Sequence, residues 1–235
     1  LRRLVLEDCS GVSETVSSGF LGAAPNLEIL NYRNVSILSQ SINISVKLRV
    51  LILFSSPQLT DAMFCNIVHS CPLLEVVGLS SCMLLTDKSL LKLAQHAKCL
   101  NALFLSQNTN FSDTLLQAIA KHCGERLKLL GLWQCTSITN VGLNHITEWC
   151  HQLEGVYVDY MNHISTAAVA SVLRVNPLLR EVSLGSYSEE DGDALLTVLS
   201  TCCPLLMYCN IYFLKGYTEA GVYAVIEACP DLRTI

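Results

Sequence analysis

The stretch LKLLGLWQC, residues 127–135, decides the fold. It has leucine at its first, fourth and sixth positions and cysteine at its ninth, which defines the template L-x-x-L-x-L-x-x-C. The template recurs from Leu1 to Cys9 and, with valine at position four, from Leu74 to Cys82. A fixed period of roughly 26 residues along the whole chain predicts stacked repeats, because one short unit cannot bury its apolar side alone. Weaker copies of the template begin at Leu27, Leu48, Leu100, Leu153, Leu179, Leu206 and Leu232.

The second half of each repeat predicts a helix. An apolar residue is followed by Ser or Thr and then often by Asp or Asn, as in Leu-Thr-Asp at residues 85–87 and Ile-Thr-Asn at residues 138–140. The hydroxyl can cap a helix by accepting backbone N–H bonds, and an acid suits the positive helix end. Apolar residues at helical spacing follow, and proline ends the helix after cysteine at Cys71-Pro72.

These motifs, L-x-x-L-x-L-x-x-C, then I/L-T-D, then L-x-x-L, then C-P-x-L, together resemble the cysteine-containing leucine-rich repeat. This repeat is best known from F-box/LRR proteins, the substrate receptors of SCF-type ubiquitin ligases. The resemblance covers essentially all 235 residues. It implies an α/β leucine-rich-repeat solenoid, or horseshoe, with a parallel concave β-sheet and convex helices. We expect one leucine-rich-repeat domain over residues 1–235, of about nine repeats, as a fragment of a longer protein.

The template also predicts where the strands lie and where the pattern weakens. Residues 36–47 show no clean helix pattern in a short second repeat, and residues 189–193 replace the usual turn with an acidic group that favours the next helix start rather than a calcium site. Strands are expected at residues 3–7, 29–33, 50–54, 76–80, 102–106, 129–133, 155–159, 181–185 and 208–212, in that order along one parallel sheet.

Composition excludes several classes of protein. With 51% hydrophobic and 15% charged residues, the chain is not disordered. A net charge of −5 gives no basic surface for nucleic acid, so no nucleic-acid partner is expected. Residues 194–214 carry no charge, but the repeat register divides them into a helix end and a strand, so no membrane span is expected.

The twelve cysteines favour buried thiols over disulfides or metal ligands. Eight of them occupy two repeat positions, after the strand and at the helix end, where other repeats place Ala97 or Met161. Free cysteine packs as a small hydrophobic residue, so we expect reduced thiols in a cytoplasmic or nuclear protein. Cys65, His69 and Cys71 on one helix lack the paired C-x-x-C spacing of zinc sites, and we expect no metal.

No catalytic motif is present, neither G-x-S-x-G nor a P-loop nor H-E-x-x-H, so no enzyme is expected. An anionic cofactor would need several Lys or Arg side chains on the concave face. Template positions three, five and seven should face that side, and only Arg3 and Arg33 provide a positive charge there. We therefore expect no cofactor.

The concave face instead predicts a protein-binding surface. Its expected side chains are nearly uncharged in the middle and hold six of the sixteen aromatic residues (6 Phe, 2 Trp, 8 Tyr). Exposed aromatics among small residues commonly anchor protein partners. Asp159 is expected at the rim, where it could contact a basic residue, and Trp133→Ala is expected to weaken binding with little effect on stability. The candidate partner-binding residues are Phe54, Phe104, Trp133, Tyr157, Asp159, Tyr208 and Tyr212.

The function that this pattern predicts is protein recognition. The resemblance implies the substrate-binding part of an SCF-type ubiquitin ligase receptor, held to the ligase core by an F-box outside this sequence. The alternative is a structural leucine-rich-repeat scaffold subunit of a large assembly without a ubiquitin role. An F-box-like segment before residue 1 in the longer protein would favour the ligase function over the scaffold.

Overall fold

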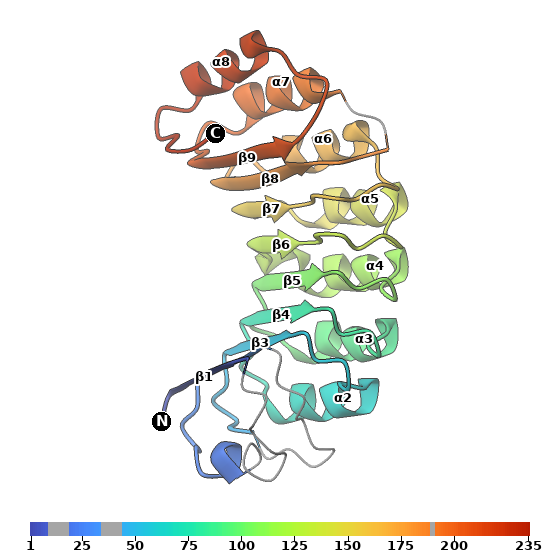
Figure 1. The fold of residues 1–235 in the computed structure, drawn as a ribbon, viewed down its shortest axis with the longest axis vertical. Coiled ribbons are helices and arrows are strands. Elements are labelled where there is room, and N and C mark those ends of the chain that lie inside the picture. Colours follow the sequence, from blue (N-terminus) through green and yellow to red (C-terminus); the bar gives the residue numbers. More distant parts are fainter. Residues whose placement is uncertain (9–18, 34–43, 189–190) are drawn as a thin grey trace. The chain divides into compact units, whose positions relative to one another are not determined.

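The computed structural model describes residues 1–8, 19–33, 44–188 and 191–235 (Figure 1). The expectations for Cys9, for most of the weak helix pattern at 36–47 and for Glu189 lie outside these residues. The chain forms two compact units, unit 1 over Leu1–Phe111 and unit 2 over Ser112–Ile235. The single domain over residues 1–235 stays a prediction.

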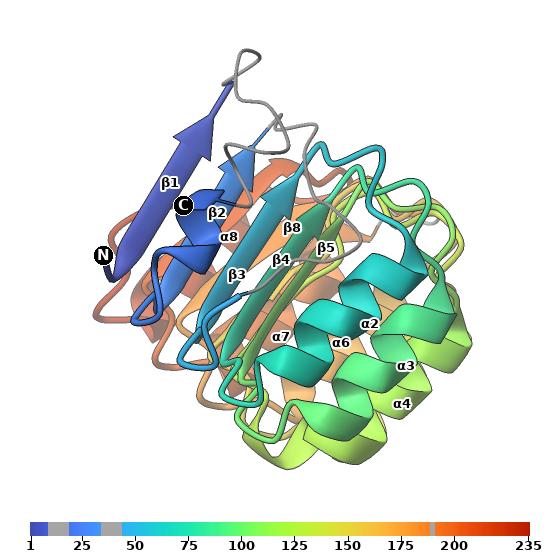
Figure 2. The same ribbon diagram turned by 90° about the horizontal axis from the view of Figure 1, so that it is seen from below.

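Unit 1 is a five-stranded parallel sheet with helices against one face. Neighbours along the chain are neighbours in the sheet, and equal template positions pair, as in Arg3 with Ile29 and Val76 with Ala102. Figure 2 shows α2 and α3 packed side by side on one face of the sheet. The elements are β1 (Arg3–Glu7), β2 (Ile29–Arg33), β3 (Val50–Phe54), α2 (Asp61–Ser70), β4 (Val76–Ser80), α3 (Asp87–His96) and β5 (Ala102–Ser106).

Unit 2 repeats the same alternation with four parallel strands, again in chain order. Each helix packs on the helix of the next repeat (Figure 1). The elements are α4 (Asp113–Cys123), the 3₁₀ helix η1 (Gly124–Arg126), β6 (Leu129–Gly131), α5 (Asn140–Trp149), β7 (Gly155–Tyr157), α6 (Thr166–Arg174), β8 (Glu181–Gly185), α7 (Gly192–Cys202), β9 (Tyr208–Phe213) and α8 (Glu219–Ala228).

Six of the nine expected strands have the predicted bounds. Strands β6 and β7 are two residues shorter than expected, although hydrogen bonds between repeats continue beyond them, from the Leu132 N–H to the Tyr157 carbonyl at 2.8 Å. Residues 194–214 hold all but the first two residues of α7 and the whole of β9, so they divide into a helix and a strand as the register predicted. Among the helices that the structure describes, none combines the length and apolar character needed to cross a membrane.

The Ser and Thr residues predicted as caps do begin helices. In α2 to α6 and in α8 the residue before the helix is Ser or Thr, and its hydroxyl accepts a backbone N–H, as Thr139 does from Val141 at 3.2 Å. In α7 the cap is Asp191, which accepts the Ala194 N–H at 3.1 Å. The acidic group at 189–193 therefore includes the cap of α7.

Acidic residues at the start of a helix also connect successive repeats. The Asp113 carboxylate accepts the Thr139 backbone N–H at 2.8 Å and the Thr139 hydroxyl at 2.6 Å. Asp61 binds Thr86 in the same way within unit 1. Each carboxylate thus orients the cap of the next helix in addition to favouring the positive end of its own helix.

The apolar template positions form the core of both units. Leucines at positions four and six are fully buried in the regular repeats, among them Leu53 and Leu105 in unit 1 and Leu130 and Leu132 in unit 2. They point toward the helices, so positions three and five lie on the opposite side of each sheet. We call this opposite side the open face of each unit.

Candidate functional site

The open face of unit 2 is ordered in rows that cross the strands. Position three contributes Leu129, Gly155, Glu181 and Tyr208, which pair in register from β6 to β9. Position five contributes a second such row in the same strands. Because the strands are in register, side chains in one row are neighbours at roughly 4.8 Å per strand. The second row is Gly131, Tyr157, Ser183 and Asn210.

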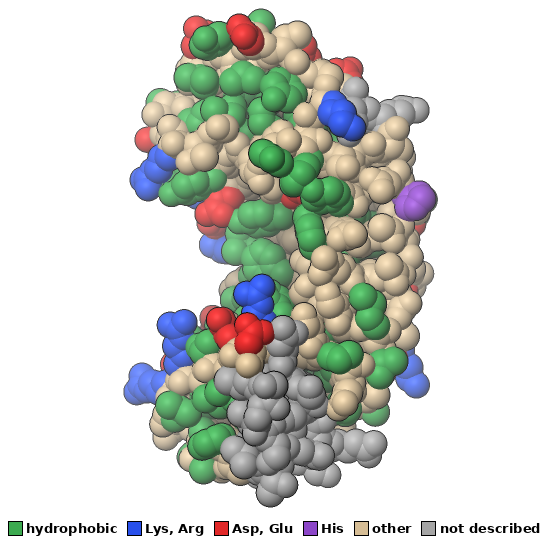
Figure 3. Space-filling model, viewed as in Figure 1, with side chains coloured by type: hydrophobic (Ala, Val, Ile, Leu, Met, Phe, Trp, Pro, Cys, Tyr) green, Lys and Arg blue, Asp and Glu red, His purple; other side chains and the backbone are tan. Residues whose placement is uncertain are grey.

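Four aromatic side chains form a continuous cluster where these strands end. The ring of Trp133 meets Tyr160 edge-on with centroids 5.6 Å apart, Tyr160 packs on Phe213 at 4.4 Å, and Phe213 meets Tyr212 at 4.7 Å. We call Trp133, Tyr160, Phe213 and Tyr212 the aromatic cluster. Figure 3 shows hydrophobic side chains gathered in the part of unit 2 where β8 and β9 end.

The members of the aromatic cluster differ in exposure. Tyr212 is 82% exposed, whereas Trp133 is only half-exposed because it packs on Tyr160. The expectation that Trp133 can be removed with little effect on stability is therefore weakened by its packing. Tyr212 is the side chain that a partner can reach with the least cost to the fold.

Tyr160 takes its place through an unusual backbone conformation. It lies at template position eight with φ of 56°, in the left-handed region that a bulky residue seldom adopts. The same position is left-handed in other repeats, for example at Ser81, Gln107 and Gln134. In these repeats the turn after the strand imposes the conformation, and Tyr160 presents a ring where its neighbours present short or polar side chains.

A chain of hydrogen bonds crosses the open face of unit 2 and ends at a carboxylate. The Tyr212 N–H donates to the Asn210 side-chain oxygen at 3.0 Å, the Asn210 amide to the Ser183 hydroxyl at 3.0 Å, and that hydroxyl to Asp159 at 2.9 Å. Asp159 is only 4% exposed. Asp159 was predicted to lie exposed at the rim of the face. This prediction is wrong, because the Asp159 carboxylate is buried and accepts a hydrogen bond from Ser183. Burial raises the pKa of Asp159 above its ordinary 3.8, although the Ser183 bond opposes this.

Tyr157 lies over its own strand and contacts the next one. Its hydroxyl donates to the Glu181 carboxylate, and burial together with this bond raises the pKa of the phenol. The position is open because residue 155 is glycine: a Cβ there would lie 3.3 Å from the Tyr157 ring and 2.7 Å from Leu129 Cδ2. Tyr157 is therefore half-buried, with its ring held by the bond to Glu181.

Unit 1 has a smaller apolar area on its own open face. Gly78 pairs with Phe104 on one side and Ile52 on the other. The Ile52 and Phe54 side chains lean over Gly78, at 2.8 Å and 3.5 Å from where its Cβ would stand. Phe54 and Phe104 are half-exposed. The expected proximity of Phe104 to Trp133 involves both units and stays a prediction.

The structure thus brings Trp133 and Tyr212 together in the aromatic cluster. It separately places Tyr157 beside Glu181, which pairs with Tyr208. Tyr160, Phe213 and Glu181 also belong to this surface and are not among the residues predicted for it from the sequence. Glu181 lies at a position predicted to face this side, and its charge in a nearly uncharged region could have identified it as a candidate site residue. Tyr160 and Phe213 fall outside positions three, five and seven, so the alternation rule could not have found them.

The cysteines that the structure describes are free thiols, and most are buried. Burial raises the pKa of Cys71, Cys150, Cys203 and Cys209 to about 12, so these thiols are unreactive near neutral pH. Cys65 and His69 of α2 line a surface pocket of about 280 Å³ with His96 of α3. Within residues 1–8, 19–33, 44–188 and 191–235, no three His, Cys, Asp or Glu side chains are grouped to hold a metal ion.

Comparison with known proteins supports the repeat class. No family model matches the chain. F-box/LRR-repeat protein 4 of Bos taurus is 28% identical over 132 residues, which are 56% of this chain and 21% of that protein. The match therefore spans about a fifth of the length of this relative.

Two solved structures share the fold. Rad7, in the yeast Rad7 and Elc1 complex, aligns with a TM-score of 0.71 and 17% identity over 99% of this chain and 68% of that chain. Internalin C2 of Listeria monocytogenes aligns with a TM-score of 0.57 and 16% identity over 88% of this chain and 80% of that one. With the strand and helix order above, these similarities establish an α/β leucine-rich-repeat solenoid.

Proposed function

We propose that this chain is a protein-recognition domain that binds its partner on the open face of unit 2. The observation that carries this proposal is the aromatic cluster with Tyr157 beside it. Aromatic side chains supply large contact areas at low conformational cost, and they dominate the energetics of protein interfaces. Gly155 beside them gives the Tyr157 ring room to lie over the sheet, where a partner can contact the ring.

The partner is a protein, and the role is binding rather than catalysis. The carboxylate of Asp159 is buried in a hydrogen-bond chain, and the most buried thiols have a pKa of about 12. Neither group has the activated state that nucleophilic catalysis needs. Buried thiols fit a reducing compartment, which supports a cytoplasmic or nuclear location. Phe54 and Phe104 are the candidate aromatic contacts on the open face of unit 1, considered by itself.

The finer proposal is the substrate-binding part of an SCF-type ubiquitin ligase receptor. The repeat motifs and the partial match to an F-box/LRR-repeat protein support it. In this function the solenoid holds the target while an F-box elsewhere in the longer protein binds the ligase core. The scaffold function remains the competing outcome of the experiment below.

The experiment compares the tagged full-length protein with two variants in cells. Tyr212→Ala removes the most exposed ring of the aromatic cluster, and Tyr223→Ala removes a 62% exposed ring from α8 as a matched control. We expect the Tyr212 variant to lose at least tenfold in partner recovery, about 1.4 kcal/mol or more, while the control retains its partners.

Partner lifetime then separates the two functions. For a ligase receptor, the partners lost by Tyr212→Ala should become longer-lived while the ligase core still co-purifies. For a scaffold, the complex should dissociate with no change in partner ubiquitylation. Equal partner recovery by both variants would contradict binding on the open face of unit 2.

A further inference from the structure

Glu181 stands in the middle of the open face of unit 2 between two tyrosines. The Tyr157 hydroxyl donates to its carboxylate from the preceding strand. Tyr208, 41% exposed, pairs with Glu181 in register on the following strand. One oxygen of the carboxylate is thus held by the phenol, while the half-exposed group keeps further acceptor capacity toward solvent.

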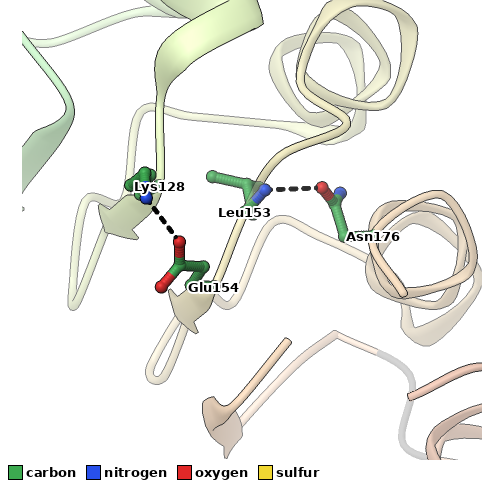
Figure 4. Close-up of polar contacts among 4 residues, drawn as sticks. All are labelled: Lys128, Leu153, Glu154 and Asn176. Atoms are coloured by element: carbon green, nitrogen blue, oxygen red, sulfur yellow. Dashed lines mark hydrogen bonds and ion pairs between the residues drawn. The ribbon is translucent and has the colours of Figure 1, made fainter. Parts of the chain in front are cut away.

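The charge of this carboxylate is not balanced within the described residues. Template positions three, five and seven of the four repeats that contain β6 to β9 hold Asp159 and Glu181 but no Lys or Arg. By contrast, the neighbouring row at template position two is paired, since Lys128 Nζ lies 2.7 Å from Glu154 (Figure 4). Among the residues that the structure describes, no Lys or Arg forms an ion pair with Glu181.

The surroundings of Glu181 favour a planar cation. A guanidinium group can donate two parallel bonds to a carboxylate and stack on an aromatic face, whereas an ammonium is a strongly hydrated point charge. Tyr157 and Tyr208 provide rings on the strands either side of Glu181. The fixed orientation of Tyr157 over Gly155 lowers the entropy lost on binding.

We propose that Glu181, Tyr157 and Tyr208 form a subsite for an arginine side chain of an extended partner segment. This inference rests on the proposed function. The aromatic cluster begins four to five residues further along the strands, which is about 13–17 Å. A partner segment running with the strands would therefore place an apolar residue about four positions from its arginine.

The test uses a phage-displayed library of random twelve-residue peptides selected on the whole chain. Clones that also bind Tyr212→Ala are discarded, and the best peptides are synthesised for calorimetry. We expect them to carry arginine, and their Kd to rise at least tenfold with Glu181→Gln. Gln keeps an acceptor for Tyr157, so the fold is preserved. Glu154→Gln removes the same charge outside the face and should leave Kd unchanged.

A peptide with citrulline in place of arginine completes a double-mutant cycle with Glu181→Gln. Citrulline is nearly isosteric but neutral, and its loss of affinity should coincide with that of Glu181→Gln rather than add to it. Replacement by lysine should restore only part of the binding. Peptides that need Tyr212 but lack arginine, or that ignore Glu181→Gln, would overturn the arginine subsite and leave the proposed function intact. Recovery of no peptide that needs Tyr212 would overturn both.

Discussion

Leu130 is the residue whose loss should damage unit 2 most clearly. It is fully buried on β6, and its side chain faces α5 and α6 in a space with no room for a water molecule. Leu130→Ala removes three carbon atoms from this space. At about 0.8 kcal/mol per buried methylene, the lost transfer energy is about 2.4 kcal/mol. The space that remains adds a cavity cost, so the free energy of unfolding should fall by about 3–5 kcal/mol.

Tryptophan fluorescence during urea unfolding measures this loss within unit 2. Both tryptophans of the chain, Trp133 and Trp149, lie in unit 2, so the signal reports that unit. Leu178→Ala, at a leucine 38% exposed, is the matched control and should cost less than about 1 kcal/mol. If the two variants have equal midpoints at equal slope, Leu130 does not carry the packing described here.

Two further predictions concern titratable groups. Because burial raises the folded-state pKa of Asp159, folding favours its protonated form, and its ionisation reduces stability as pH rises above 3.8. Asp159→Asn should therefore melt at a higher temperature than the wild type at pH 7, with the difference shrinking toward pH 3.5; a constant difference in calorimetry would contradict the buried carboxylate. For the thiols, iodoacetamide at pH 8 should label exposed Cys99 first and Cys150 at least a hundredfold more slowly, because the pKa of Cys150 is about 12. Mass spectrometry of denatured, unreduced chain should then find all twelve cysteines labelled, and several protected cysteines would indicate disulfides.

Most of the fold could be predicted because each repeat carries the same local sequence pattern for a strand, a turn and a helix. The two-residue spacing of Leu130 and Leu132, repeated at the same template positions in other repeats, defines a strand with one buried side, and Thr139 marks the start of the next helix. The period then gives the order and parallel direction of strands within each unit. The predicted C-terminal ends of β6 and β7 lie two residues beyond the observed ends, because the alternation of buried side chains continues after the regular strand pairing stops.

The site was harder to predict because it depends on exceptions to the repeat. Tyr160 contributes through a left-handed turn that the alternation rule ignores. Asp159 was expected to face solvent, but its carboxylate is buried and accepts a hydrogen bond from the Ser183 hydroxyl of the next repeat. Both effects arise from contacts between repeats, which a pattern within one repeat cannot specify.

Contacts between repeats also explain why cysteine and asparagine share one template position. Position nine holds Cys82 in one repeat and Asn108 in the next, and both are buried. The Cys82 thiol donates to the Leu53 carbonyl at 3.4 Å, and the Asn108 amide donates to the equivalent carbonyl, that of Leu79, at 3.1 Å.

A purely apolar residue would leave each of these carbonyls without its side-chain donor, at a cost in a buried setting of roughly 1–3 kcal/mol where no other bond replaces it. Asn108 also accepts the Cys82 N–H at 2.8 Å, a bond that a thiol makes only weakly. The prediction of a small apolar site at position nine was therefore incomplete. In these two repeats the position selects a small side chain that can donate a hydrogen bond, and cysteine meets both conditions.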